Sequence, residues 1–205
     1  GLHAVLIVMT AKGLHTRGGS NVPATPDRVL QSTRCPVLFI RPAHASRVAR
    51  MQGLRRIMLP LDGALSTTAA IGPVIGIAEK SGAELEVLYV VEERMSATGE
   101  PAAFPMPRYV DQAHYEWPAW AQECIHRLGA LTVQRRVEVS TRVFVRRGDP
   151  EREILSFAAE RDPDLIVLEW RGRLDPGRAA VLRGVLETSP SPVLVLRTAP
   201  AESVA

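Results

Sequence analysis

Short apolar runs, separated by polar and turn-rich stretches, recur along the whole chain. Runs of this length are typical of strands in a parallel sheet that is buried on both faces. We therefore expect strands at residues 4–9, 36–41, 57–61, 84–91, 139–145, 164–168 and 192–197.

The segments between these runs carry helix signals. Ser66 is expected to cap a helix that Gly82 ends, with Gly72-Pro73 either kinking the helix or delaying its start. Pro150, after the turn at Gly148-Asp149, suits the first turn of another helix. We expect helices at residues 27–32, 66–81, 108–131 and 150–160, and a short one before the last strand.

This order of elements indicates the fold class. Strands that alternate with helices favour a parallel sheet covered on both faces. Residues 55–198 alone provide five strands and the helices between them. We therefore expect an α/β fold there, with a doubly wound, five-stranded parallel sheet.

The two ends of the chain repeat one another. Residues 28–43 align on residues 184–199 with seven identities in sixteen positions. The apolar runs at 4–9 and 164–168 align at an offset of 159 residues, whereas those at 36–41 and 192–197 align at 156. Such self-similarity indicates an internal repeat. We expect a β-α-β fragment of a preceding repeat at 1–45, a linker at 46–54, a complete domain at 55–198 and a tail at 199–205.

The fragment matches only the last third of the complete domain, so the front of a first domain is expected to be missing. A lone β-α-β unit cannot cover both faces of its own strands. It must pack on the second domain, on another chain, or on residues that were removed before this chain was made.

Composition narrows the choice of function. No apolar run reaches the roughly 18 residues that a membrane span needs, and no basic segment precedes the first run as in a signal peptide. We therefore expect a cytoplasmic protein.

Cys35 and Cys124 are too few for a disulfide framework or a metal cluster, and Cys35 is expected as a buried thiol. The net charge is +3, but the basic residues are scattered and aromatic residues make up 5%, which argues against nucleic-acid binding.

Several stretches, at this spacing, resemble the universal stress protein family. They are Arg-Ile-Met-Leu-Pro-Leu-Asp-Gly at 56–63, the strand at 83–91, Gly-Asp-Pro at 148–150, Asp-Leu-Ile-Val at 164–167 and Pro-Val-Leu-Val-Leu-Arg at 192–197. The resemblance implies an adenine-nucleotide alpha-hydrolase-like fold with strand order 3-2-1-4-5. It also implies dimers or pseudo-dimers that pair through final strands. The partners here would be residues 37–41 and 193–197, in a homo-oligomer or an intrachain pseudo-dimer.

In such a sheet a ligand binds outside the carboxyl ends of the strands, where the strand order reverses. ATP-binding members of the family carry a loop of Gly, two residues, Gly, nine residues, and Gly-Ser or Gly-Thr. The matching positions here are Glu169, Gly172 and Ala179-Ala180, in a loop three residues shorter than in the first copy. Glu169 puts a carboxylate where phosphate charge would sit, and Trp170 is expected to add bulk there. The first copy has Thr10, Gly13 and Pro23-Ala24 at these positions.

Other residues fit the alternative interpretation, in which the chain has a nucleotide-binding site. Asp62 would hold an adenine or ribose group, as its match does in the family, or it forms a turn before Gly63. Arginines at 171, 173, 178 and 183 would hold phosphate, or they are solvated surface residues. Gly148 contacts the nucleotide or serves only its turn. The candidate nucleotide contacts are Asp62, Gly63, Val91, Gly148, Gly172, Arg173, Arg178 and Ala180.

These observations lead to one expectation and several alternatives. We expect a non-enzymatic stress-response or regulatory protein with a degenerate nucleotide site, no catalytic residue, no cofactor, no metal and an unknown protein partner. The main alternative is an ATP- or AMP-binding sensor that uses Asp62 and the arginine-rich loop at 171–183. An enzyme, such as an ATP hydrolase or nucleotidyl transferase, would need an intact phosphate cradle or an acidic metal site. A detached soluble tail of a membrane transporter is a further alternative.

Overall fold

The computed structural model describes residues 5–10, 25–61, 70–91, 139–170 and 176–197. No helix in these ranges is long and apolar enough to cross a membrane. In chain order the elements are β1 (Ile7–Thr10), α1 (Thr25–Ser32), β2 (Val37–Ile40), η1 (Pro42–His44), α2 (Ala45–Arg50), β3 (Arg56–Leu61), α3 (Ile71–Ser81), β4 (Glu84–Val91), β5 (Thr141–Arg147), α5 (Pro150–Arg161), β6 (Leu165–Trp170), α6 (Pro176–Thr188) and β7 (Val193–Arg197).

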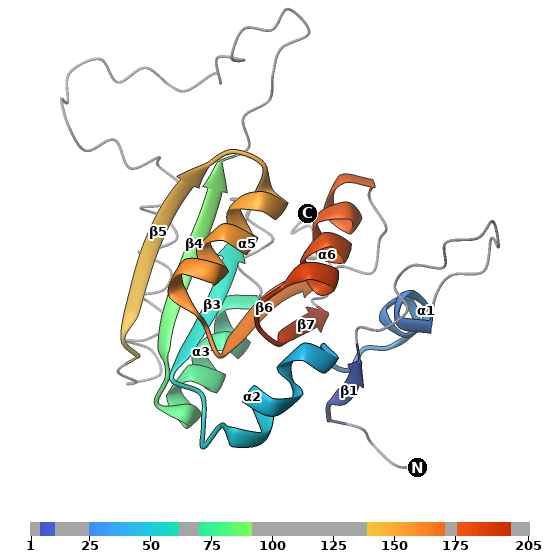
Figure 1. The fold of residues 1–205 in the computed structure, drawn as a ribbon, viewed down its shortest axis with the longest axis horizontal. Coiled ribbons are helices and arrows are strands. Elements are labelled where there is room, and N and C mark those ends of the chain that lie inside the picture. The colour runs from blue at the N-terminus through green and yellow to red at the C-terminus, as the bar shows by residue number, and fades with distance from the viewer. Residues whose placement is uncertain (1–4, 11–24, 62–69, 92–138, 171–175, 198–205) are drawn as a thin grey trace, which may run out of the picture.

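All seven of these strands form one sheet, in the order β1-β2-β7-β6-β3-β4-β5 (Figure 1). Every pair of neighbours is parallel except β2 and β7, which are antiparallel. Numbered within residues 55–198, the strands β3 to β7 lie in the order 3-2-1-4-5. The α/β fold with a mainly parallel sheet is therefore confirmed.

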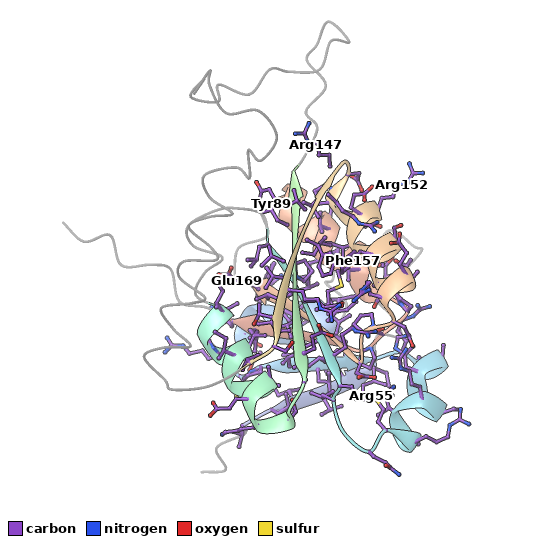
Figure 2. The ribbon with its side chains drawn as sticks, turned by 90° about the vertical axis from the view of Figure 1, so that its left-hand side faces the viewer. Arg55, Tyr89, Arg147, Arg152, Phe157 and Glu169 are labelled. Carbon is purple, nitrogen blue, oxygen red and sulfur yellow. The ribbon has the colours of Figure 1, made fainter. Side chains whose placement is uncertain are left out.

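Helices cover both faces of the sheet. Figure 2 shows α3 on one side of the strands and α5 on the other. One buried apolar cluster joins the sheet to α1, α5 and α6, and includes Leu30, Phe157 and Val185. The second joins it to α3, and includes Ile71 and Ile75. The central strands are buried on both faces, which explains why they appear in the sequence as nearly continuous apolar runs.

The observed boundaries differ from the expected ones mainly at turns. The first helix begins at Thr25, before the expected residue 27, and this places Pro26 in the first turn, where its missing N–H costs little. The strand expected at 139–145 is Thr141–Arg147. The strand at 84–91 and the end of α3 at Gly82, whose φ is 68°, are as expected. The expected Ser66 cap and the expected helix at 108–131 lie outside the described residues. Cys35, expected to be buried, is partly exposed.

The antiparallel ladder between β2 and β7 is symmetric with respect to the internal repeat. Leu38 lies opposite Leu194, Val37 opposite Val195 and Phe39 opposite Val193. At the offset of 156, residues 37, 38 and 39 correspond to 193, 194 and 195. Leu38 therefore pairs with its own equivalent in the repeat, and Val37 pairs with the equivalent of Phe39. The two copies therefore meet about a local twofold axis at Leu38 and Leu194.

Side chains around this axis exchange equivalent hydrogen bonds. Arg41 Nη1 donates to the carbonyl oxygen of Ser189 at 2.9 Å, and Arg197 Nη1 donates to that of Thr33 at 2.7 Å. Arg41 and Arg197 are equivalent in the repeat, as are Thr33 and Ser189. Reciprocal contacts of this kind are typical of isologous interfaces, and the intrachain pseudo-dimer stays a prediction.

The segment expected as a linker is folded over most of its length, as η1 and α2. His44 is only 6% exposed, and its Nε2 lies 3.0 Å from the Ser189 carbonyl oxygen. Arg47 forms ion pairs with Asp162 and Asp164 at the amino-terminal side of β6. These contacts attach the segment to the second repeat, although the domain boundaries themselves stay a prediction.

Asp164 organises the start of two neighbouring strands. Its Oδ2 accepts from the backbone N–H groups of Arg55 at 2.8 Å and Arg56 at 3.1 Å. Burial by itself raises the pKa of this carboxyl, but these donors and Arg47 outweigh burial, so the pKa is lowered. The charged carboxylate thus anchors β3, α2 and β6 at one point.

Acid should weaken the attachment at His44. A carbonyl oxygen only accepts, so Nε2 carries the hydrogen, and Nδ1 is buried without a partner in the described structure. Burial, together with the charges of Arg41 and Arg47, lowers the pKa of His44 below its usual value of about 6.5, although the bond to Ser189 opposes the shift. The unfolded chain therefore takes up a proton at a higher pH than the folded chain, and stability falls as the pH drops below about 6.5.

We expect the free energy of unfolding in urea to fall by up to about 1 kcal/mol between about pH 7.5 and pH 5.5. The control is His44→Gln, which keeps an N–H donor for the Ser189 carbonyl but cannot become charged. Its stability should change less over the same range. An equal loss of stability in both proteins would contradict the role assigned to His44.

Candidate functional site

The pairing of β3 with β6 stops early. Only Ile57 with Leu165 and Met58 with Ile166 are paired, whereas the β3–β4 ladder continues to Leu61 and Tyr89, and the β6–β7 ladder to Trp170 and Arg197. The carboxyl halves of β3 and β6 are therefore not joined by the sheet. This is also where the strand order reverses, which makes it the candidate site.

Two polar side chains lie on the α3 side of the sheet near this point. Glu169 is next to last in β6, and Tyr89 in β4 lies opposite Leu61, the last residue of β3. Figure 2 shows both on the side where α3 lies. Tyr89 is 9% exposed, and Glu169 is half-buried. Sequence reasoning missed Tyr89, although a hydroxyl near the carboxyl end of an apolar strand was an available signal.

Trp170 does not narrow this site, so that expectation was wrong. Successive side chains of a strand point to opposite faces, and Trp170 therefore lies on the face opposite to Glu169. It is 4% exposed, and its Nε1 donates to the carbonyl oxygen of Leu30 at 3.1 Å. Trp170 thus attaches α1 of the first repeat to the sheet.

The structure describes only some of the predicted nucleotide contacts. Val91 ends β4 and lies opposite Arg147 of β5, while Arg178 and Ala180 belong to α6, where Ala180 is exposed. Asp62 and Gly63 directly follow β3 in the sequence. The predicted contacts that lie outside the described residues are Asp62, Gly63, Gly172 and Arg173.

Gly148 has a clear backbone role. It follows β5 with a φ of 144°, which side-chain-bearing residues rarely adopt. Asp149 then caps α5, since its Oδ1 accepts from the N–H of Arg152 at 2.9 Å, and Pro150 occupies the first turn. Gly148 therefore serves the turn into α5, as its sequence context predicts, and its contact with a nucleotide stays a prediction.

The opposite end of the sheet is closed by ion pairs. Glu86 is fully buried, accepts from Arg161 Nε at 2.9 Å and lies 3.4 Å from Arg56 Nε. A groove of about 690 Å³ at this end has Arg47, Arg50 and Arg55 in its lining. Figure 2 shows Arg55 far from Arg147, which marks the carboxyl end. This groove is therefore separate from the candidate site.

The described residues contain no group of three or more His, Cys, Asp or Glu side chains that could hold a metal ion. What they offer at the candidate site is the carboxylate of Glu169 and the phenol of Tyr89, with Leu61 at the end of β3.

Comparison with known proteins identifies the family. The model of the universal stress protein family matches residues 53–197. The chain belongs to this family. Universal stress protein MJ0531 of Methanocaldococcus jannaschii is 27% identical over 146 residues, which are 70% of this chain and 82% of that protein.

Two solved structures show the same fold. A universal stress protein from Archaeoglobus fulgidus DSM 4304 has a TM-score of 0.58 and 18% identity, and its structure covers 94% of this chain. This chain spans only 60% of the length of that protein. A universal stress protein solved in complex with cAMP has a TM-score of 0.50 and 22% identity, with 71% of this chain and 98% of that chain covered.

We expect Gly148→Ala to lower the free energy of unfolding by about 1–3 kcal/mol, because alanine is strained at this φ. The new Cβ would also meet Glu153 Oε1 at 3.1 Å. Gly53→Ala is the matched control, since nothing lies within 4 Å of a Cβ there and its φ is not positive. Urea unfolding of both variants measures the difference. Equal stabilities would show that the turn does not need glycine.

Proposed function

We propose that this universal stress family protein acts without catalysis, as a stress-response or regulatory protein whose output is a surface for a protein partner. In this proposal its nucleotide site is degenerate and binds neither ATP nor AMP tightly. The observation that carries the proposal is Glu169, a half-buried carboxylate on the α3 side of the sheet where β6 diverges from β3.

The negative charge of Glu169 is unfavourable for a nucleotide phosphate at this position. A nucleotide that used the family's loop would bring its phosphates close to the first residue of the motif, which is Glu169 in this chain. Two like unit charges 4 Å apart repel by about 4 kcal/mol at the effective dielectric typical of a protein surface. That is a substantial share of the roughly 8 kcal/mol of a micromolar complex. The carboxylate therefore opposes binding of any phosphate held there.

The rest of the motif supports the same conclusion. Glycines let backbone amides approach a phosphate, and only Gly172 of the three motif glycines is present. Ala179-Ala180 replaces the final Gly-Ser or Gly-Thr, so the hydroxyl is missing, and Ala180 lies exposed within α6. No intact phosphate cradle remains in the sequence, which argues against catalysis at this position. A cytoplasmic location stays a prediction.

The second candidate function is a sensor that binds ATP or AMP. The solved relative in complex with cAMP matches 71% of this chain in fold, which favours a nucleotide as the ligand of this chain too. Binding would then depend on Asp62 and on the arginines at 171–183, whose guanidinium groups can hold phosphate without a glycine cradle.

Calorimetry with ATP, ADP, AMP and cAMP separates the two candidates. We expect ATP to bind the wild-type protein more weakly than about 1 mM. Glu169→Gln should tighten ATP binding by at least about tenfold, because it removes the repelling charge while keeping the shape of the side chain. The control Glu79→Gln changes an exposed carboxylate near the end of α3 and should leave affinity unchanged.

Micromolar binding of ATP or AMP to the wild-type protein would overturn the first candidate. If Asp62→Ala then abolished that binding, the sensor would be supported. Unchanged affinity in Glu169→Gln would show that the carboxylate is not what weakens the site.

A further inference from the structure

The groove at the amino end of the sheet is lined mainly by the segment first expected as a linker. This segment contributes Arg47 and Arg50 of α2 and all of residues 51–55. Ser81 at the end of α3 also lies in the lining, as do Asp162 and Asp164 of the turn from α5 to β6. The volume of about 690 Å³ lies within the range of about 300–1,000 Å³ that is usual for ligand pockets.

Arg47 is a fixed part of this groove. Its guanidinium group pairs with Asp162, lies 3.3 Å from Asp164 Oδ1 and donates to the carbonyl oxygen of Pro163 at 3.1 Å. Asp164 is only 4% exposed and also accepts from two backbone N–H groups. The charges of Arg47 and Asp164 are therefore already satisfied within the protein.

Arg50 and Arg55 are the cations that the groove presents to a ligand. The side chain of Arg55 is 90% exposed, and its Nε is 3.9 Å from Asp164 Oδ2, beyond hydrogen-bond distance. The backbone of Arg55 is fixed, because its N–H donates to Asp164 and its carbonyl oxygen accepts from the N–H of Glu84 at 2.9 Å. Arg50 is exposed and donates through Nε to the Ser46 carbonyl oxygen at 3.0 Å, and it pairs with no carboxylate among the described residues.

Apolar side chains lie between these two cations along the chain. Met51 and Leu54 are half-buried in the lining, and Leu54 also packs against the apolar cluster on the α3 side. Gln52 and Gly53 between them are exposed. The groove therefore combines two available guanidinium groups with a partly apolar lining.

We propose that this groove binds an acidic segment of a partner protein, in which carboxylates flank an apolar side chain. The carboxylates would pair with Arg50 and Arg55, and the apolar side chain would contact Met51 and Leu54. Arginine suits this role because its planar fork can donate two hydrogen bonds to one carboxylate. The inference rests on the proposed function, in which a protein contact is the output, and it gives that contact a place and a chemistry.

Asp162 favours spaced carboxylates over a compact anion such as a polyphosphate. Its carboxylate is 71% exposed in the same lining, so a dense negative charge held by the arginines would be repelled by it. An extended peptide rises by about 3.3 Å per residue, and its single charges are therefore spread along the groove. Its backbone N–H groups can also donate to the carboxylate of Asp162.

Fluorescence anisotropy with the labelled pentapeptide Glu-Glu-Leu-Glu-Glu tests the proposal on the 205-residue chain at low ionic strength. We expect a Kd below about 100 μM, and at least about tenfold weaker binding of Gln-Gln-Leu-Gln-Gln. The double variant Arg50→Gln and Arg55→Gln should weaken binding of the acidic peptide by at least about tenfold. Both side chains are exposed, so the fold should be unchanged, and circular dichroism checks this.

The matched control is Arg152→Gln, an exposed arginine that Figure 2 shows far from Arg55. This variant should bind the acidic peptide like the wild type. A wild-type protein that does not bind the peptide would overturn the proposal. So would a double variant that binds as well as the wild type, or an equal loss of affinity in Arg152→Gln.

Competition tests the class of ligand. We expect tripolyphosphate and a short oligothymidylate each to displace the peptide only at concentrations at least about tenfold above that of the unlabelled peptide. If either anion bound more tightly than the peptide and lost that binding in the double variant, the groove would be a polyanion site. The assignment to an acidic protein segment would then be wrong.

Glu169→Gln separates this inference from the proposed function. It should leave peptide affinity unchanged, because Glu169 lies near the carboxyl end of β6, whereas the groove lies at the amino end. A groove that fails to bind the peptide would leave the nucleotide affinities of the protein as they are. Micromolar binding of ATP would overturn the degenerate nucleotide site without changing the result for the peptide.

A proximity reaction locates the bound peptide. In a background with Cys35→Ser and Cys124→Ser, Gln52→Cys should react with an iodoacetyl-labelled acidic peptide at least about tenfold faster than Ala180→Cys, because binding raises the local concentration. Gln52 lines the groove, whereas Ala180 is exposed on α6. Both rates are divided by the rate with free iodoacetamide, which corrects for the reactivity of each thiol. Equal ratios for the two cysteines would overturn the assignment to this groove.

Discussion

The antiparallel pairing of β2 with β7 is the constraint on which the rest of the molecule depends. It joins a strand of the first repeat to the last strand of the second, and so combines both copies in one sheet. Val37 and Val195, which face each other there, are 1% and 2% exposed. Without this ladder both strands would be apolar edges, a state that favours aggregation. The arginine exchange and the Trp170 bond to Leu30 add polar contacts on either side of it.

The two ends of the sheet have different physical characters. At the amino end, Asp164 and the fully buried Glu86 collect arginines and backbone N–H groups from β3, α2 and α5. Buried carboxylates are tolerated there because each has charged or backbone donors. At the carboxyl end, β3 and β6 are no longer paired. One end therefore holds the strands together through charged side chains, whereas at the other end the β3–β6 ladder has stopped.

The same alternation of side chains that builds the sheet also shapes the candidate site. Glu169 and Trp170 are neighbours in sequence, yet one lies on the α3 side and the other is buried against α1. A single strand thus places a carboxylate at the candidate site, and its next residue, Trp170, attaches α1 to the sheet. The site and the interface between the repeats are consequently linked through β6.

The sequence by itself determined the elements that depend on local chemistry. Apolar runs located the strands, Gly148-Asp149-Pro150 marked the start of α5, and the offset of 156 residues predicted an internal repeat. These succeed because strand burial, capping and turn geometry depend on residues close together in the chain. Tertiary structure decided the rest: the folding of the segment after Pro42, the face that Trp170 occupies, and the early end of the β3–β6 ladder. Each of these depends on partners more than a hundred residues away, such as Ser189 for His44 and Leu30 for Trp170, and no local pattern specifies such a pairing.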